Sequence, residues 1–564
     1  MRIKDGKKFI RNIIIIFIAI VVIICILKVA PNYKKAEFEN RTNLIINNNN
    51  VTGNLKKDII IDDLGVIYLS KKDIANFFDK YISYDNIENT NQKVYNQIIT
   101  TSDTKVGVLK LNENKIIING AEIEITGCAK IIDEEIYLPF SEMEKVYNID
   151  IEYIKESDII TVESLDRELI KANANKNISI KSKKTIFSRT INKVKKGESV
   201  TVISEDKGWI KLRTSLGYIG YVKQNKLGEN IVLREKLEYS NNIEGKINLV
   251  WDYYSEYASA PDRTGTKIEG INVISPSFFV LEKLGQGEII DNVGEEGKKY
   301  IQWAKDNNYE IWAMISNNSM PQTTSEIMRD YNLREKLINK IIDLCYKYNL
   351  DGINIDFENM YEEDKDLFSR FIIELAPRLK ENNLVLSVDV TAPDGSPMWS
   401  GCFDRNTIGN VADYIVFMAY DQYNDSSENA GTVAGYDWIE IALNKFVGVQ
   451  EDVDSDKIIL GMPFYTRLWK EKDGEKIDSN VVNMKNVDNV LPENIEKVWN
   501  DELKQNYVEY EKSGITYKMW IEDLDSIKEK VGLVKKYNLA GVASWAKDRE
   551  DERVWKVIKE ELNK

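Results

Sequence analysis

The 564-residue chain carries 76 basic and 91 acidic side chains and a net charge of −15. This acidic balance argues against nucleic acid as a partner, and the length predicts several domains. The absence of histidine excludes Ser-His-Asp and Cys-His catalysis and nearly every catalytic zinc site. Four widely spaced cysteines predict neither a zinc ribbon nor a disulfide framework: Cys25, Cys128, Cys345 and Cys402. We expect no metal or other cofactor, and chemistry carried by carboxylates and tyrosines.

The chain opens with a basic and then an apolar segment. Residues 1–12 carry five Lys and Arg side chains, and residues 13–30 are almost entirely apolar. This order predicts a cytoplasmic tail followed by a single-pass transmembrane signal anchor. A cleaved signal peptide is the alternative, although no A-x-A-type cleavage site is present. Both interpretations place the rest of the chain outside the cytoplasm, facing the cell wall. The Asn- and Lys-rich residues 31–57 predict a linker.

An α+β domain is predicted over residues 58–165. VIYLSKKDIANFF (66–78) and EIYLPFSEMEKVY (135–147) share an I-Y-L strand followed by a short helix. Between them, Asn119-Gly120 predicts a hairpin turn. The pattern resembles the copper-amine-oxidase N-terminal-like domain of bacterial surface proteins. That resemblance implies a stalk or wall-contact module, and no copper, because the chain has no histidine to hold one.

Residues 178–228 change to short strands and turns. The run GWIKLRTSLGYIGYV within them resembles bacterial SH3-like domains, which usually bind cell-wall peptide or glycan. Trp209, Tyr218 and Tyr221 are candidates for a ligand groove. In the alternative interpretation, Trp209 and Tyr221 belong to the core of a small all-β barrel.

From residue 246 to residue 564, eight apolar runs alternate with amphipathic helical patterns. Eight such strand–helix repeats predict a (β/α)8 TIM barrel. The competing doubly wound sheet usually has a Gly-rich phosphate turn after its first strand, and none follows Trp251. The predicted architecture is therefore multidomain: an N-terminal transmembrane helix, an α+β domain, a small SH3-like barrel and a C-terminal TIM barrel.

The segment GINIDFE (352–358) contains the most informative pattern in the predicted barrel. Asn354, Asp356 and Glu358 alternate with apolar residues, as on a strand whose faces differ. A parallel barrel strand has no face open to water, so we expect these three side chains to point into the barrel. Active sites of such barrels lie at the carboxyl ends of the strands. The pattern predicts a catalytic pair of acids at the end of the fourth strand.

DGINIDFE (351–358) also looks like the D-G-x-D-x-D-x-E signature of glycoside hydrolase family 18, the chitinase and endo-N-acetylglucosaminidase family. FMAYDQY (417–423), GMPFYTRLW (461–469) and GVASWAKD (541–548) resemble three further motifs of the family, in the right order. The resemblance spans the whole predicted barrel. It implies retaining hydrolysis in which the substrate's own acetamido group replaces an enzyme nucleophile.

The resemblance also implies roles for individual residues. Glu358 would be the general acid, Asp356 would accept the acetamido N–H, and Tyr420 would orient the acetamido oxygen. Trp545 would form the floor under the sugar. Further substrate contacts are implied, of which the last three could equally form a structural network: Asp351, Asn354, Met418, Asp421, Tyr465 and Arg467. Trp251 and Trp438 match no family position and are interpreted as packing residues.

Two departures from the family pattern narrow the substrate. Asn354 stands where chitinases carry an acid, so we expect Asp356 to meet less like-charge repulsion and to ionise more readily. Asn here resembles the spore and cell-wall subgroup, whose members cleave N-acetylglucosaminyl bonds in peptidoglycan. The run AMISNN (313–318) lacks the S-x-G-G of true chitinases. We therefore expect an extracytoplasmic peptidoglycan glycosidase. The alternatives are a chitinase or glycan-trimming endoglycosidase, and a catalytically silent glycan-binding protein.

Overall fold

The computed structural model describes the chain except residues 1, 30–40, 86–95, 237–242, 244 and 256. Contacts divide it into two units, one made mainly by residues 1–240 and the other mainly by residues 241–564. Each unit has its own sheets and its own apolar core.

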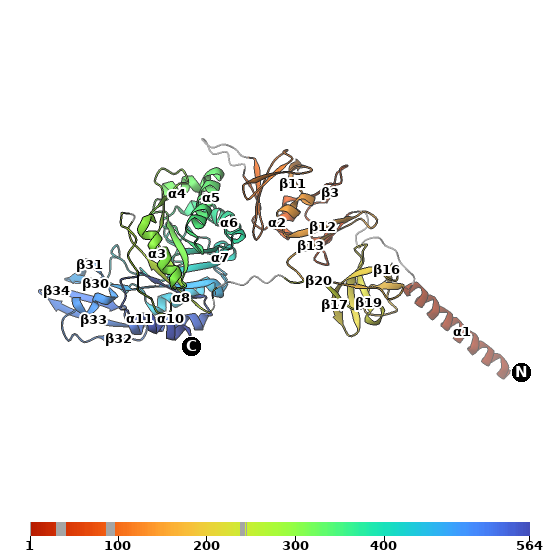
Figure 1. Ribbon diagram of the computed structural model, residues 1–564. Coiled ribbons are helices and arrows are strands. Elements are labelled where there is room, and N and C mark those ends of the chain that lie inside the picture. The colour runs from red at the N-terminus through yellow and green to blue at the C-terminus, as the bar shows by residue number, and fades with distance from the viewer. Residues whose placement is uncertain (1, 30–40, 86–95, 237–242, 244, 256) are drawn as a thin grey trace. The chain divides into compact units, whose positions relative to one another are not determined.

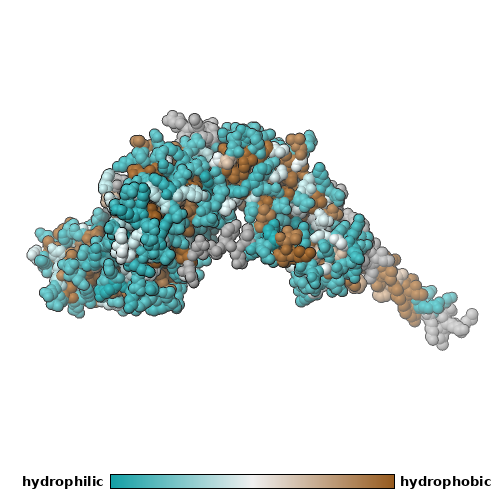
Figure 2. All heavy atoms as spheres, viewed as in Figure 1, coloured by the Kyte–Doolittle hydropathy of each residue, from teal (hydrophilic) through white to brown (hydrophobic). Residues whose placement is uncertain are grey.

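The N-terminal segment forms helix α1 (Arg2–Val29). Its described apolar side chains, from Ile10 to Ile24, are exposed and colour the helix brown in Figure 2. Among the described residues, no helix combines the length and apolarity needed to cross a membrane. The transmembrane anchor predicted over residues 13–30 is therefore not confirmed.

The described residues of the predicted α+β region form three small sheets and one α-helix. Its I-Y-L repeat is real: β4 (Ile67–Ser70) leads into α2 (Lys71–Phe77), and β11 (Glu135–Pro139) leads into a 3-10 turn over Phe140–Lys145. These two strands pair antiparallel. The Asn119-Gly120 hairpin is confirmed between β8 (Lys115–Ile118) and β9 (Ala121–Glu124). The remaining strands are β3 (Ile60–Ile61), β5 (Ser83–Asp85), β6 (Gln97–Thr101), β7 (Val106–Lys110), β10 (Lys130–Ile132), β12 (Ile149–Ile154) and β13 (Ile159–Ser164).

The predicted linker over residues 31–57 is wrong for its second half. Residues 31–40 lie outside the described residues, but β1 (Asn43–Ile46) and β2 (Asn49–Asn50) are strands. β1 runs parallel to β13, with Asn43 opposite Ile159. Leu44 is fully buried there, so a partner more than one hundred residues away orders a stretch that has little periodicity of its own.

Residues 169–234 form one seven-stranded sheet that is larger than the predicted 178–228 domain. It contains Trp209, which is 8% exposed, and a core of small aliphatic residues. The resemblance to SH3-like domains, and that of the preceding region to the amine-oxidase module, stay predictions. In sheet order the strands are β16 (Thr190–Val194), β15 (Ile178–Lys181), β19 (Ile219–Lys223), β18 (Trp209–Arg213), β17 (Ser199–Asp206), β14 (Leu169–Asn173) and β20 (Ile231–Arg234).

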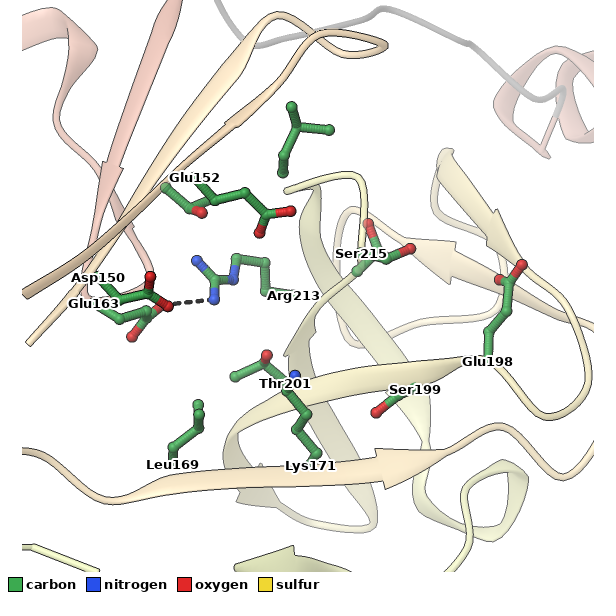
Figure 3. A pocket seen from close by; sticks show the side chains of 13 residues that line it. Asp150, Glu152, Glu163, Leu169, Lys171, Glu198, Ser199, Thr201, Arg213 and Ser215 are labelled. Carbon is green, nitrogen blue, oxygen red and sulfur yellow. Dashed lines mark ion pairs between the residues drawn. The ribbon is translucent and has the colours of Figure 1, made fainter. Parts of the chain in front are cut away.

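A cavity of about 390 Å³ lies within this first unit. Figure 3 shows its lining, which comes from β12 and β13 on one side and from β14, β17 and β18 on the other. Arg213 crosses between the two sides and pairs with Glu163 at 2.6 Å. Both side chains are largely buried, so this ion pair ties the seven-stranded sheet to β13.

The predicted TIM barrel is confirmed in the second unit (Figure 1, green to blue). Eight parallel strands pair in chain order, and the last pairs with the first to close the barrel. All eight predicted apolar runs supply one strand each: β21 (Ile247–Asp252), β22 (Val273–Pro276), β25 (Glu310–Ser316), β26 (Gly352–Asp356), β27 (Val385–Val390), β28 (Tyr414–Met418), β29 (Ile458–Pro463) and β35 (Gly541–Trp545).

Helices cover the outside of the barrel and bury the apolar face of each strand. Phe357, just after β26, stacks on Phe371 of α6 at a ring distance of 6.0 Å, and Cys345 of α5 is buried as predicted. The outward face of the motif is thus the packing face. The helices are α3 (Gly294–Asp306), α4 (Pro321–Arg329), α5 (Tyr331–Tyr348), α6 (Lys365–Glu381), α7 (Arg405–Val411), α8 (Tyr436–Val447), α10 (Leu524–Tyr537) and α11 (Val554–Leu562).

A five-stranded antiparallel sheet is inserted between β29 and β35. It has a small core of its own, and its strand β30 carries the predicted contacts Tyr465 and Arg467. Its strands are β30 (Tyr465–Lys472), β31 (Glu475–Asn483), β32 (Val498–Asn500), β33 (Gln505–Lys512) and β34 (Ile515–Ile521), with the short helix α9 (Val487–Val490) between β31 and β32. The hairpin β23 (Phe279–Leu281) and β24 (Ile289–Asp291) extends the barrel sheet beside β25.

Candidate active site

The two predicted acids lie at the carboxyl end of the fourth barrel strand, as expected. Asp356 is the last residue of β26, and Glu358 follows two residues later. Ile353 and Ile355 belong to the core cluster between barrel and helices. Alternation therefore turns Asn354, Asp356 and Glu358 toward the barrel interior.

Asn354 lies deep inside the barrel, and its predicted substrate contact stays a prediction. It is completely buried, and its amide oxygen accepts from Trp251 Nε1 at 2.8 Å and from Ser275 Oγ at 3.2 Å. Its amide nitrogen donates to Ser387 Oγ at 3.1 Å and to Asp389 Oδ1 at 2.7 Å. Trp251 is likewise more than a packing residue, because its indole N–H fixes this amide.

Asp389 is a site residue that the sequence analysis missed. It lies on β27, next to β26, and is 2% exposed. The run VLSVDV alternates polar and apolar residues just as GINIDF does, so the same strand rule would have placed Ser387 and Asp389 inside the barrel.

The ionisation expected for Asp356 is corrected by its burial. Burial raises the pKa of Asp356 to about 7, and burial together with the Asp356 charge raises the pKa of Asp389 well above its usual range. Asp356 therefore ionises less readily than an ordinary aspartate. Although Asn354 stands where the family pattern has an acid, the barrel interior still holds a second carboxyl group beside Asp356. The fifth strand supplies it, as Asp389.

Glu358 is held by hydrogen bonds to its backbone, and its surroundings raise the pKa of its carboxyl group. Asn317, completely buried, accepts the Glu358 N–H at 3.0 Å and donates to the Glu358 carbonyl at 2.9 Å. Burial, the Asp356 charge and the Asp421 charge raise the pKa of Glu358 well above its usual range. A carboxyl that keeps its proton near neutral pH is suited to act as a general acid.

Tyr420 and Tyr465 form the wall beyond β28. Their rings meet edge to face at 6.3 Å, and Tyr465 donates to Asp421 Oδ1 at 2.5 Å. Burial, Tyr465 and the nearby acids Asp389, Glu358 and Asp356 raise the pKa of Tyr420 well above 10. The Tyr420 hydroxyl therefore stays protonated and can donate a hydrogen bond.

Arg467 belongs to the same rim. It is 9% exposed, pairs with Asp425 at 3.5 Å and donates to Ser479 at 2.8 Å. Arg549, which the sequence analysis missed, lies over the Tyr465 ring at 5.5 Å. Tyr465 and Asp421 thus form a hydrogen-bonded pair, whereas Arg467 binds Asp425 and Ser479. The sugar contacts of Asp421, Tyr465 and Arg467 stay predictions.

Trp545 lies at the end of β35 on top of other aromatic rings. It meets Trp251 edge to face at 5.7 Å and Tyr253 in a tilted contact at 5.4 Å. Trp251 is buried, whereas Tyr253 is 50% exposed. Trp545 thus packs against one buried and one exposed ring, and its role as the floor under the sugar stays a prediction.

The other two predicted substrate contacts, Met418 and Asp351, lie at opposite ends of the barrel. Met418, at the end of β28, shares the inward face with Tyr414 and Val416. Asp351 precedes β26, and its carboxylate accepts the Ile311 N–H at 2.9 Å. It lies five strand rises, about 16 Å, before Asp356, and its substrate contact stays a prediction. In the described part of the chain, no cluster of Cys, Asp and Glu could hold a metal ion.

Known proteins resemble this barrel in sequence or in structure. The chain is 28% identical over 302 residues to the uncharacterized glycosylase YvbX of Bacillus subtilis (strain 168), covering 51% of this chain and 84% of that protein. It is 28% identical over 240 residues to a protein of the same organism named "Putative sporulation-specific glycosylase YdhD". It is 24% identical over 235 residues to the cortical fragment-lytic enzyme of Bacillus anthracis. The match spans only 56% and 53% of those two proteins.

A chitinase from Chromobacterium violaceum ATCC 12472 has a similar structure, with a TM-score of 0.50 and 23% identity over 57% of this chain and 99% of that chain. At this identity the likeness concerns the fold. The family model for glycosyl hydrolases family 18 matches residues 250–550, more than half of the chain. The protein therefore belongs to glycosyl hydrolases family 18 and is a glycoside hydrolase.

Proposed function

We propose that this glycoside hydrolase cleaves N-acetylglucosaminyl β-1,4 bonds in peptidoglycan by substrate-assisted retaining hydrolysis. The observation that carries the proposal is Glu358, whose pKa is raised by burial and by neighbouring acids, beside Asp356 and Tyr420 at the carboxyl end of the barrel strands. Burial and two neighbouring acids keep the Glu358 proton in place, as the acid of a glycosidase requires.

In the proposed reaction, Glu358 gives its proton to the glycosidic oxygen as the bond to the anomeric carbon breaks. The acetamido oxygen of the same sugar attacks that carbon and forms an oxazolinium ion. Asp356 accepts the acetamido N–H and stabilises the positive charge, while Tyr420 orients the acetamido oxygen. Glu358, now a carboxylate, takes a proton from the water that opens the ion. Substrates without a 2-acetamido group should not react.

The choice of peptidoglycan rests on Asn354 and on the relatives. A sporulation-specific glycosylase and a cortical fragment-lytic enzyme bear names of cell-wall processes. Since peptidoglycan lies outside the cytoplasm, we extend the proposal to an extracytoplasmic enzyme that faces the wall. In this proposal the α+β and all-β regions of the first unit hold the barrel at the wall.

The second candidate is action on chitin or on other N-acetylglucosamine glycans, because the catalytic set itself requires only the acetamido group. The exposed Tyr253 beside Trp545 favours an extended glycan chain in either case. The two candidates share the acids and differ in what lies along the cleft.

The test is digestion of purified peptidoglycan by the full chain beside Glu358→Gln, with products reduced, labelled and identified by mass spectrometry. We expect new reducing-end N-acetylglucosamine from the wild type alone. Reducing-end N-acetylmuramic acid would contradict the bond assignment. Cleavage of chitin oligomers without release from the wall would favour the second candidate. Binding to either glycan without cleavage would indicate a silent glycan-binding protein.

A further inference from the structure

Asp389 lies beside Asp356 on the neighbouring strand of the barrel. The parallel register pairs Asn354 with Ser387 and Ile355 with Val388, so Asp356 and Asp389 are the next positions in line. Neighbouring strands are about 4.8 Å apart, and alternation turns both side chains inward. Two carboxyl groups therefore occupy one level of the barrel interior, one strand apart.

The amide of Asn354 determines how Asp389 is held. The Trp251 indole is a donor only and bonds the amide oxygen at 2.8 Å, so the amide nitrogen must face Asp389 Oδ1, at 2.7 Å. A flipped amide would lose both bonds. Since an amide neither takes up nor releases a proton in this range, changes of charge at this level fall on the two carboxyl groups.

A purely structural role does not require an acid at position 389. A neutral side chain would accept the Asn354 bond without the cost of burying a charge. Asp389 is instead an acid with 2% exposure, and its pKa is raised by burial and by the Asp356 charge. Two such interacting acids titrate as a pair, and both do not ionise together near neutral pH.

We propose that Asp389 is a positioning residue that shares one proton with Asp356. In the family pattern this role belongs to an acid at position 354. The inference rests on the proposed substrate-assisted reaction. When Asp356 is anionic and accepts the acetamido N–H, the proton lies on Asp389. One O–H bond breaks on one carboxyl group and one forms on the other, so the pair keeps its single proton and no other reactant is needed.

The test compares Asp389→Asn with the swap Asn354→Asp/Asp389→Asn, which returns the acid to the fourth strand. Asp389→Asn should lower kcat by about 10- to 100-fold with little change in KM. In the proposed pair Asp389 holds the proton when Asp356 ionises, and this neighbouring O–H favours the Asp356 anion. Without it Asp356 should ionise less readily, so the acid limb of kcat/KM should move about one pH unit higher. The swap should bring the limb back toward the wild-type position and recover at least part of kcat.

Asp413→Asn is the matched control. Asp413 is a largely buried acid that accepts the Leu386 N–H at 2.9 Å at the start of β28, the far end of the barrel from Glu358. It should not move the acid limb. The inference would be overturned if Asp389→Asn folds and lowers kcat without moving the limb, or if the swap recovers neither the limb nor kcat.

A second readout needs no substrate. With ¹³C-labelled aspartate, NMR should follow the Asp356 carboxyl titrating at higher pH in Asp389→Asn than in the wild type. If the wild type cleaves none of the glycans tested, the proposed function fails, and this titration still decides the inference. An unchanged Asp356 titration in the folded variant would refute the proton sharing.

Discussion

Replacing Asn317 by alanine tests how the general acid is positioned. Asn317 makes two hydrogen bonds to the Glu358 backbone, at 3.0 and 2.9 Å, and a third to Thr324 Oγ1 at 3.1 Å. It lies on the loop after β25 and is completely buried. In Asn317→Ala the Glu358 N–H and C=O lose their partners, while the carboxyl group itself is untouched.

The structure sets the size of the effect. Each lost hydrogen bond contributes about 0.5–1.5 kcal/mol, and groups left buried without partners cost more. We expect the free energy of unfolding to fall by about 3 kcal/mol. A displacement of a catalytic group by about 1 Å can cost on the order of 100-fold in rate, so kcat should fall by about 100-fold. KM should change much less, because Asn317 is buried away from the substrate.

The assay is steady-state hydrolysis of the glycan that the wild type cleaves, with chemical denaturation run in parallel. Asn318→Gly is the matched control: Asn318 is the next residue, is exposed, and has a φ of 50° that glycine adopts freely. It should keep wild-type kcat. Wild-type kcat in Asn317→Ala would refute the idea that this clamp positions the acid.

Three further predictions follow from buried charge. Burial raises the pKa of Asp356 from 3.8 to about 7, so the folded state favours the protonated acid and its stability falls as pH rises through that window. Asp356→Asn should therefore be inactive, but at pH 8 its free energy of unfolding should exceed that of the wild type by on the order of 2 kcal/mol. The gain should be smaller at pH 5. Chemical denaturation that shows no gain at pH 8 would contradict this prediction. In the wild type, kcat/KM should decline as pH falls below about 7, because Asp356 takes up a proton; an acid limb near pH 4, measured from pH 3 to 9, would show an ordinary aspartate instead. Finally, Lys530 and Glu522 pair at 2.9 Å with both side chains fully buried, so Lys530→Met should destabilise by about 3–5 kcal/mol. Adding Glu522→Gln should recover much of that loss, because no unpaired charge then stays buried. The control is Lys528→Met, an exposed position on the same helix, which should be nearly neutral. Equal effects of the two lysine variants on thermal unfolding would contradict the prediction.

Local patterns predicted the barrel and its acids because both depend on alternation along single strands. The apolar residues 353, 355 and 357 had to face the helices, so the polar residues between them had to face the interior. Asp351 was named from the family motif and not from alternation, and it lies before β26, at the opposite end of the strand from Glu358. Motif membership alone does not say which end of a strand a residue occupies.

Residues brought in from other strands escaped the sequence analysis. Asp389, Asn317 and Arg549 contact the site from three other parts of the chain, and nothing near Glu358 in the sequence points to them. Residues 43–54 were assigned to a linker for a similar reason, since β1 is ordered by β13.

The sequence by itself determined the class of fold, the family and the two acids at the end of the fourth strand, because each depends on periodicity or spacing within a short segment. Only the tertiary structure decided how those acids ionise. The pKa of a carboxyl group depends on burial and on charges within a few ångströms. The folded barrel places Asp389 beside Asp356, and the buried Asn354 amide bonds to Asp389 across the two strands. Distance in space, which the order of residues does not contain, sets the chemistry of this site.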